Sequence, residues 1–210
     1  MSKIKFEQCC GERDDSLITE PIRRRLPAYY RALIDLYSEG KEKVNAKQLA
    51  TLVGACETQV KTDLTAIGCK GQPGYGYSIA RLYRRIGEVM NIHDKYSAVI
   101  VGNGAFAEAV SQSHLFTKRG IKLEGRFSNI DACAEGDASN LGFEEFCKRY
   151  SVDIIIMACD AAQAKECLTI AQSVGVKGVM NFSEAELTSD VITVRNLHID
   201  DTLMMLCSEI

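Results

Sequence analysis

The chain has 210 residues, of which 46% are hydrophobic and 25% charged, and its formal net charge at pH 7 is -3. These proportions are typical of a soluble globular protein, and no stretch approaches the ~20 consecutive apolar residues that a membrane-spanning helix needs. The first residues lack the apolar core and cleavage site of a secretory signal. We therefore expect a cytoplasmic protein with two compact domains and no membrane partner.

Charge is distributed unevenly along the chain. Residues 21–85 contain 12 Lys or Arg against 5 Asp or Glu, whereas residues 91–210 contain 10 against 17. A basic front half joined to an acidic back half is typical of a DNA-binding module attached to a regulatory domain.

Nine cysteines are present, but they form no CxxC pair and no cluster with histidines. We expect no metal site, and most of the thiols should be small buried apolar side chains. The adjacent Cys9 and Cys10 lie in a polar segment and could be reactive. Residues 1–17 are expected to form a flexible tail.

Residues 18–91 carry the pattern of a winged helix-turn-helix domain. Apolar residues between Leu26 and Tyr37 recur at helical spacing, and Gly40 is placed to end this helix. Asn45 is a suitable N-cap for a second helix, 46–53, which Gly54 separates from a third, 57–67. Gly68 to Tyr77, with four glycines, predicts a wing, and a last helix follows over 78–90.

The third helix has polar residues of the kind that read bases. We expect Gln59, Lys61 and Thr62 to reach base edges, with Lys47 and Lys70 on phosphates. Arginines 23, 24, 25 and 31, together with Lys61, give the module the positive charge that DNA binding requires. The alternative is a small helical packing or protein-interaction module whose basic residues form a solvated face.

The back half, residues 92–197, begins with an apolar run, 96–101, and a glycine turn. The turn reads Gly102, Asn103, Gly104, Ala105, Phe106, Ala107, followed by a helical segment, 108–116. This G-x-G-x-x-A pattern after a strand is typical of a Rossmann dinucleotide site, in which a pyrophosphate lies against the helix N-terminus.

Strands and helices then alternate, which predicts an α/β fold with a parallel doubly wound sheet. Strands are expected over 121–127, 153–158, 176–180 and 191–194, with helices over 143–150 and 161–174. Ligands bind at the carboxyl ends of such strands, where Ser128, Cys159 and Asn181 would join the glycine turn.

One feature of a NAD site is missing. The acid that usually binds the adenosine ribose is replaced at the end of the second strand by Ser128 and Asn129, and Asp131 comes three residues late. Arg126 with Ser128 could instead accept a 2′-phosphate. The pocket could also hold another ligand, or none.

Residues 198–210 predict a short amphipathic helix. Its apolar Leu203, Met204, Met205 and Leu206 are more than a lone terminal helix should expose, so we expect it to pack on a partner subunit.

In this order, the elements resemble the Rex family of NADH-responsive transcriptional repressors from about Ile18 to Ser208. The segments that carry the resemblance are 22–31, 59–64, 74–77, 101–104, 178–182 and 194–196. The resemblance implies a homodimer with a domain-swapped C-terminal helix. It also implies binding to a palindromic DNA operator, release with NADH, and a dinucleotide effector that contacts the glycine turn, Asn181 and Phe182.

The chain departs from the family pattern at several positions. Thr62 stands in place of the second basic residue of the recognition helix, Gln72 and Pro73 replace a basic pair in the wing, and Ser113 replaces a tyrosine. Arg31 matches an arginine implicated in the family's switch. A relative that binds DNA constitutively, or that answers NADP(H) or a coenzyme A derivative, is therefore an alternative.

A small NAD(P)-dependent oxidoreductase is a further alternative. We expect no enzyme, because no residues remain for a substrate domain and the histidines have no evident acid-base partners.

Overall fold

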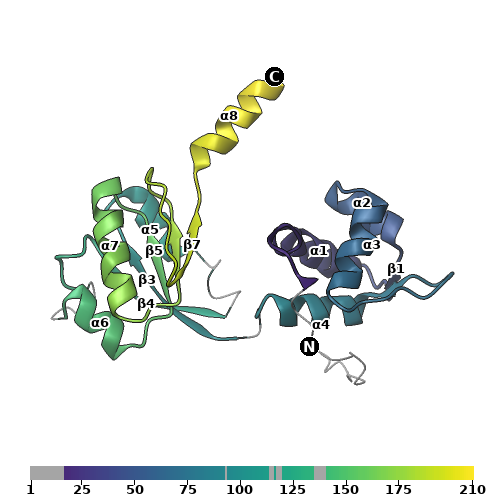
Figure 1. Ribbon diagram of the computed structural model, residues 1–210, viewed down its shortest axis with the longest axis horizontal. Helices are drawn as coiled ribbons and strands as arrows, with labels where there is room; N and C mark the ends of the chain where they lie inside the picture. Colours follow the sequence, from purple (N-terminus) through teal and green to yellow (C-terminus); the bar gives the residue numbers. More distant parts are fainter. Residues whose placement is uncertain (1–16, 93, 114–115, 117–119, 135–140) are drawn as a thin grey trace. The chain divides into compact units, whose positions relative to one another are not determined.

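The computed structural model describes residues 17–92, 94–113, 116, 120–134 and 141–210. The chain divides into two compact units, Met1–His93 and Asp94–Ile210 (Figure 1). The expectations for the tail 1–17 and for Cys9 and Cys10 fall almost entirely outside the described residues. In the part of the chain that is described, no helix has both the length and the apolar character needed to cross a membrane.

Over its described residues, 17–92, the first unit contains four helices and a two-stranded antiparallel sheet. The helices are α1 (Glu20–Ser38), α2 (Ala46–Val53), α3 (Glu57–Ala66) and α4 (Ile79–Val89), and the strands are β1 (Lys43–Val44) and β2 (Tyr77–Ser78). Their core is formed by fully buried apolar side chains from all four helices, among them Leu26, Leu33, Leu49, Leu64 and Leu82. Burial of these side chains is the main stabilising contribution to the unit.

Local sequence explains the helix-turn-helix. Asn45 and Gln48 form a capping box, in which each side chain bonds the other residue's backbone N–H, at 2.8 and 3.1 Å. Gly54 ends α2 in the left-handed conformation, at φ 66°. The Cys56 sulfur accepts a hydrogen bond from the Gln59 N–H and caps α3.

A buried ionic cluster joins α1 to α3. The Arg25 guanidinium donates two hydrogen bonds, both 2.7 Å, to the two carboxylate oxygens of Asp63, and the Tyr29 hydroxyl donates a third, also 2.7 Å. Asp63 is 1% exposed. Burial and the neighbouring carboxylate raise the pKa of Tyr29 well above its usual value, so the phenol stays a donor. The cluster fixes α3 against α1.

The second unit is a five-stranded parallel sheet in the order β4-β3-β5-β6-β7. Its strands are β3 (Tyr96–Val101), β4 (Ile121–Phe127), β5 (Ile154–Met157), β6 (Gly178–Asn181) and β7 (Thr193–Asn196). The helices are α5 (Ala105–Gln112), α6 (Phe143–Arg149), α7 (Ala161–Ser173) and α8 (Ile199–Glu209). This is the predicted Rossmann-type fold.

The two faces of the sheet are covered differently. Val99, Val101, Ile155 and Met157 pack with α6 and α7 in one cluster. Ala98, Ile100 and Ile156 pack on the opposite face with Ala107 of α5 in a smaller cluster. Helices on both faces identify the doubly wound arrangement. The helix α8 extends away from the sheet, and every residue in it is exposed (Figure 1).

Several predicted boundaries were wrong. The helix expected over 108–116 begins at Ala105, inside the glycine motif and directly after Gly104, and ends at Gln112, because Ser113 is extended. The strand expected over 191–194 runs from Thr193 to Asn196, and the one expected over 176–180 runs from Gly178 to Asn181. The two-residue β1 was missed, since a strand that short has no periodicity of its own.

Candidate nucleic-acid interface and dinucleotide site

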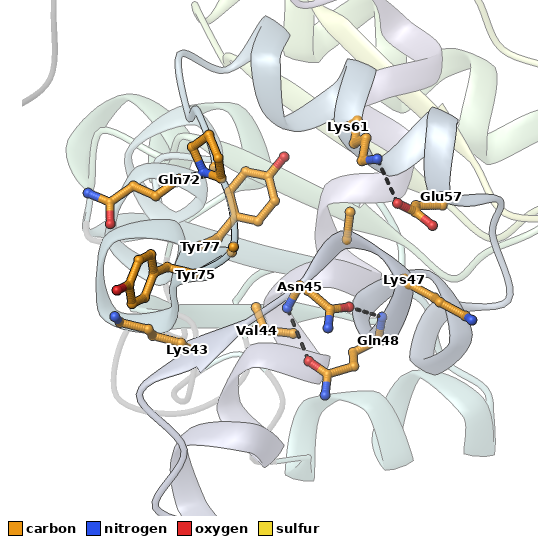
Figure 2. Close-up of a pocket in the computed structure, with 15 residues that line it drawn as sticks. Lys43, Val44, Asn45, Lys47, Gln48, Glu57, Lys61, Gln72, Tyr75 and Tyr77 are labelled. Carbon is orange, nitrogen blue, oxygen red and sulfur yellow. Dashed lines mark hydrogen bonds and ion pairs between the residues drawn. The ribbon is translucent and has the colours of Figure 1, made fainter.

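A groove of about 700 Å³ opens on the first unit between β1, the start of α2, α3 and the wing (Figure 2). Three lysines, Lys43, Lys47 and Lys61, line it, together with the wing residues Gln72, Tyr75 and Tyr77. At the tip of the wing, Gln72 and Gly76 form an antiparallel bridge. Positive charge, hydrogen-bonding side chains and a helix N-terminus thus lie along one groove. Each of these features favours binding of the phosphate backbone of DNA.

Two contacts hold cations in this groove. The ammonium of Lys43 lies 4.7 Å from the centre of the Tyr75 ring, and that of Lys61 lies 2.6 Å from a carboxylate oxygen of Glu57. The hydrogen bond from Lys61, together with the charges of Lys61 and Lys47, lowers the pKa of Glu57 below its usual value, so the carboxylate is ionised at neutral pH. Figure 2 shows the Glu57–Lys61 pair beside the groove.

The predicted DNA-binding residues fall at three places. Lys47 and Lys61 line the groove. Lys70 lines a smaller pocket of about 90 Å³ beside the wing, with Lys43 and Arg81. Gln59 and Thr62 lie on α3 outside the residues that line the groove; Gln59 is half-buried, and Thr62 is exposed and donates to the backbone oxygen of Thr58.

Sequence reasoning missed several groove residues: Lys43, Gln48, Glu57, Tyr75 and Tyr77. The wing was predicted, so its aromatic side chains could have been added. The position of β1 could not, because it depends on pairing with β2 more than 30 residues away.

The arginines of α1 serve different purposes. Arg25 was counted among the cations available to DNA, but its guanidinium is committed to Asp63 inside the unit. Arg24 pairs with Glu20 at 3.3 Å on the surface, while Arg23 and Arg31 are exposed. The ion pair with Asp63 therefore removes one charge from the expected phosphate-binding set.

In the second unit, the glycine turn has the geometry of a dinucleotide-binding loop. Gly102 has φ 153°, and a Cβ added there would collide with the backbone oxygen of Ala158 and lie 3.2 Å from the Cβ of Ala107. Gly104 is the N-cap of α5, and a Cβ there would meet nothing within 4 Å. The first glycine is needed for packing, and the second leaves open space at the helix N-terminus.

Around this turn, Asn103, Ala105 and Phe106 are exposed and Ala107 is buried. The rings of Phe106 and Phe182 meet edge to face, with centroids 5.0 Å apart. Cys159, at the end of β5, is half-buried, and desolvation by burial raises the pKa of its thiol to about 11. The thiol is therefore protonated at neutral pH.

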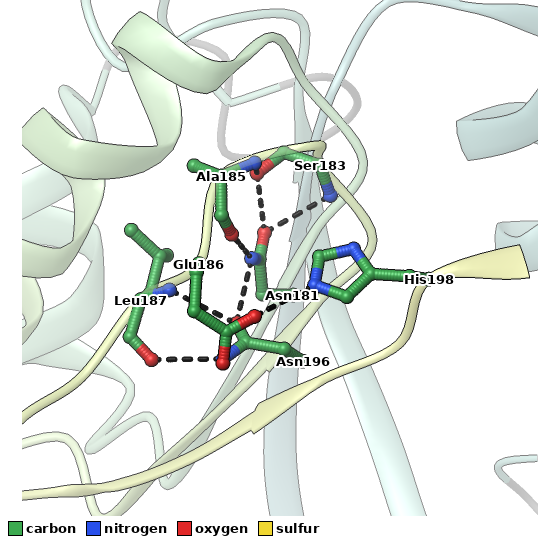
Figure 3. Close-up of polar contacts among 7 residues, drawn as sticks. All are labelled: Asn181, Ser183, Ala185, Glu186, Leu187, Asn196 and His198. Atoms are coloured by element: carbon green, nitrogen blue, oxygen red, sulfur yellow. Dashed lines mark hydrogen bonds and ion pairs between the residues drawn. The ribbon is translucent and has the colours of Figure 1, made fainter. Parts of the chain in front are cut away.

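Asn181 has a different environment from the one expected of a ligand-contacting residue. It is 0% exposed, and its amide nitrogen donates to the Ala185 oxygen at 2.7 Å and to Asn196 Oδ1 at 2.9 Å. Its own oxygen accepts from the N–H and the hydroxyl of Ser183. Asn181 thus fixes the loop after β6 to β7 (Figure 3).

The end of β4 lies beside the glycine turn, because the Gly102 N–H donates to the Phe127 oxygen at 2.8 Å. Ser128 and Asn129 follow directly and are half-buried. The Asn129 side chain accepts from the Asp131 N–H at 2.9 Å, and Asp131 is exposed. Within the described residues, no group of three or more His, Cys, Asp or Glu is arranged to hold a metal ion.

Comparison with known proteins identifies the family. A family model described as "Putative DNA-binding protein N-terminus" matches residues 18–65. The redox-sensing transcriptional repressor Rex of Thermotoga petrophila is 31% identical over 202 residues, which cover 92% of this chain and 96% of that protein. The chain belongs to the Rex family. A Rex repressor of Clostridioides difficile is 29% identical over 198 residues, covering 90% of this chain and 93% of that one.

Solved structures share the fold of this chain. The structure of RSP in complex with β-NAD+ and operator DNA has a TM-score of 0.80 and 25% identity, and 91% of each chain is covered. The structure of RSP with β-NADH has a TM-score of 0.76 and 23% identity, and it supports the shared fold alone.

Proposed function

We propose that this chain is a DNA-binding transcriptional repressor whose affinity for its operator is set by NAD+ and NADH bound in the Rossmann unit. The observation that supports this most strongly is the combination, in one chain, of a lysine-lined groove on a winged helix and an open glycine turn on a Rossmann sheet. The relatives that match over nine tenths of the chain are named redox-sensing repressors. We assign no enzymatic activity and a cytoplasmic location.

On the DNA side, Lys47 at the start of α2 would neutralise a phosphate, and Lys61 would enter the major groove with α3. Each phosphate neutralised releases counterions, so affinity would fall steeply with salt. Gln59 and Thr62 would complete the base-reading set, and Lys70 would hold the backbone beside the wing. Double-stranded DNA with a palindromic operator is the proposed partner.

On the dinucleotide side, the residues present fit a pyrophosphate. The backbone at Gly102 passes too close to Ala158 for any side chain, and Gly104 leaves the N-terminus of α5 open. The remaining proposed contacts are Asn103, Ala105, Phe106, Ala107, Ser128, Asn129, Cys159 and Phe182. Asn181, whose amide is fully engaged within the protein, would support the site by shaping the loop after β6. When bound, NAD(H) would report the redox state of the cell.

The repressor would be a homodimer. The apolar Leu203, Met204, Met205 and Leu206 of α8 are 54 to 64% exposed, which is unfavourable for a helix in water. Packing of α8 on a second copy, as a domain-swapped helix, would cover them. A twofold-symmetric dimer would match a palindromic operator.

Ser128 favours a second candidate, in which the effector differs. A serine in place of the ribose-binding acid removes the carboxylate that would accept from both ribose hydroxyls, and with it the charge that repels a 2′-phosphate. NADP(H) or a coenzyme A derivative would then replace NAD(H), or the chain would bind DNA constitutively.

A thermal-shift panel separates these candidates, because a ligand that binds only the folded state raises its stability by mass action. NADH and NAD+ should raise the midpoint more than NADPH, NADP+ or acetyl-CoA at equal concentration. A shift with NADPH alone would support the second candidate. No shift with any of them, combined with salt-sensitive DNA binding, would support constitutive binding.

A further inference from the structure

The groove proposed to bind DNA contains an acid, Glu57, at a position where a negative charge opposes phosphate binding. Glu57 is the first residue of α3, and both it and Lys61 line the groove with Lys47. Its carboxylate is 2.6 Å from the Lys61 ammonium, and the two side chains are 44% and 58% exposed. The pair is therefore accessible to DNA that enters the groove.

In this ion pair, the ammonium of Lys61 on the recognition helix α3 is bound to the Glu57 carboxylate. For Lys61 to bind a phosphate, the ammonium must leave the Glu57 carboxylate, and that carboxylate then faces the negatively charged backbone without its partner. The energetic penalty applies to every sequence, because every sequence has the same phosphates. Binding by backbone contacts alone is weakened.

The same carboxylate can be satisfied by certain bases. In the major groove, cytosine presents its N4 amino group, a donor that a carboxylate accepts, while the adjacent guanine presents O6 and N7 acceptors to a lysine. A Glu–Lys pair one helical turn apart on an exposed face of α3 matches that arrangement. In DNA sequences with a suitably placed C·G pair, Glu57 would accept a hydrogen bond from the cytosine, which the phosphate backbone cannot donate.

We propose that Glu57 is a specificity-determining residue of this DNA-binding face: it holds Lys61 back from phosphates and accepts a hydrogen bond from a cytosine N4 amino group of the operator. The proposal rests on the proposed DNA-binding function. Discrimination between DNA sequences would then depend partly on an acidic side chain, in a module whose affinity for DNA comes from its lysines.

The test compares Glu57→Gln with the wild-type chain on two measurements. The first is affinity for a pool of 24-base-pair duplexes of randomised sequence, measured by fluorescence anisotropy at several salt concentrations. Glu57→Gln should bind the pool about three- to tenfold more tightly, with a salt dependence steeper by about one released counterion. The second is selection of bound sequences from the same pool. A cytosine enriched by the wild-type chain should lose its enrichment, and adenine, which a glutamine reads, should take its place.

The chain provides a matched control. Glu144 and Lys148 of α6 form an exposed ion pair with the same spacing and the same 2.6 Å distance, and Glu144 lies in the first turn of its helix, in the other unit. Glu144→Gln makes the same change in net charge, so it should alter pool binding by less than twofold. A Glu57→Gln/Lys61→Gln double variant should lose the steeper salt dependence, because the freed lysine is gone.

The outcomes are distinct. If the wild-type chain shows no salt-sensitive DNA binding, the proposed function fails. If the wild-type chain binds DNA and Glu57→Gln leaves both pool affinity and the selected sequences unchanged, or if Glu144→Gln has an equal effect, the role of Glu57 is wrong while the DNA-binding function stands. Circular dichroism melting of each variant checks that the variant keeps the fold and stability of the wild-type chain.

Discussion

Replacing Arg25 by Met removes the cation that neutralises Asp63 inside the winged-helix unit. The Asp63 side chain is 2% exposed, and Arg25 supplies two of the three hydrogen bonds described on its carboxylate, each 2.7 Å long. Breaking a buried ion pair by removing one partner costs ~3–5 kcal/mol, because the other charge stays buried. Arg25 is 30% exposed, so water can partly replace it, and we expect the lower end, about 3 kcal/mol.

The assay is urea unfolding of the full chain followed by far-UV circular dichroism. Amide hydrogen exchange of peptides from α1 and α3 assigns the loss to the first unit. Adding Asp63→Asn to Arg25→Met removes the uncompensated charge and should recover ~1 kcal/mol or more. Tyr29→Phe, which removes one hydrogen bond to the carboxylate, should cost ~1.5–3 kcal/mol. A loss below about 1 kcal/mol for Arg25→Met, or a double variant less stable than Arg25→Met, would refute the reasoning.

Further predictions concern the second unit. Gly102→Ala should lower the unfolding free energy by more than ~1 kcal/mol, because the added Cβ collides with the backbone of Ala158. Gly104→Ala, where the added Cβ meets nothing, should change the unfolding free energy by less than ~0.5 kcal/mol. Equal melting temperatures for the two variants would contradict this. The Glu186 carboxylate, 2.8 Å from His198 Nε2, raises the pKa of that histidine, and the histidine lowers the pKa of Glu186. The pair therefore stabilises the fold fully between about pH 4.5 and 6.5, and this contribution is lost as pH rises through the raised pKa of His198 or falls through the lowered pKa of Glu186. NMR titration should show the His198 pKa falling in Glu186→Gln, and an unchanged value would exclude the pair. Leu203→Glu should convert a dimer to a monomer in analytical ultracentrifugation; a variant that stays dimeric would show that α8 is not at the interface.

Sequence reasoning succeeded where the signal is local. The glycine turn could be predicted because its short motif is flanked by a strand and a helix, and the first glycine, Gly102, lies where no side chain fits. The N-cap at Asn45 is equally local, and the structure adds the reciprocal bond from Gln48 that makes it a capping box. The alternation of strands and helices was enough to predict a parallel sheet with helices on both faces.

Contacts that form only in the folded chain explain what was missed. Asp63 lies 38 residues from Arg25, so the sequence could not show that this arginine is committed inside the unit. Asn181 carries a polar side chain at a strand end, which is typical of a ligand contact, yet the partners that engage its amide lie in the following loop and in β7. Glu57 was missed because DNA binding is predicted from basic residues, and an acid carries no such signal. Hydrogen-bond partners distant in sequence require the fold.

The most direct test of the central claim is the affinity of the full chain for a selected operator duplex, measured by fluorescence anisotropy with and without NADH or NAD+. If operator binding and dinucleotide binding are coupled, NADH should weaken operator affinity at least about fivefold relative to NAD+, and the operator should weaken NADH affinity by the same factor. Operator affinity that is equal with NADH, with NAD+ and with neither would contradict the account.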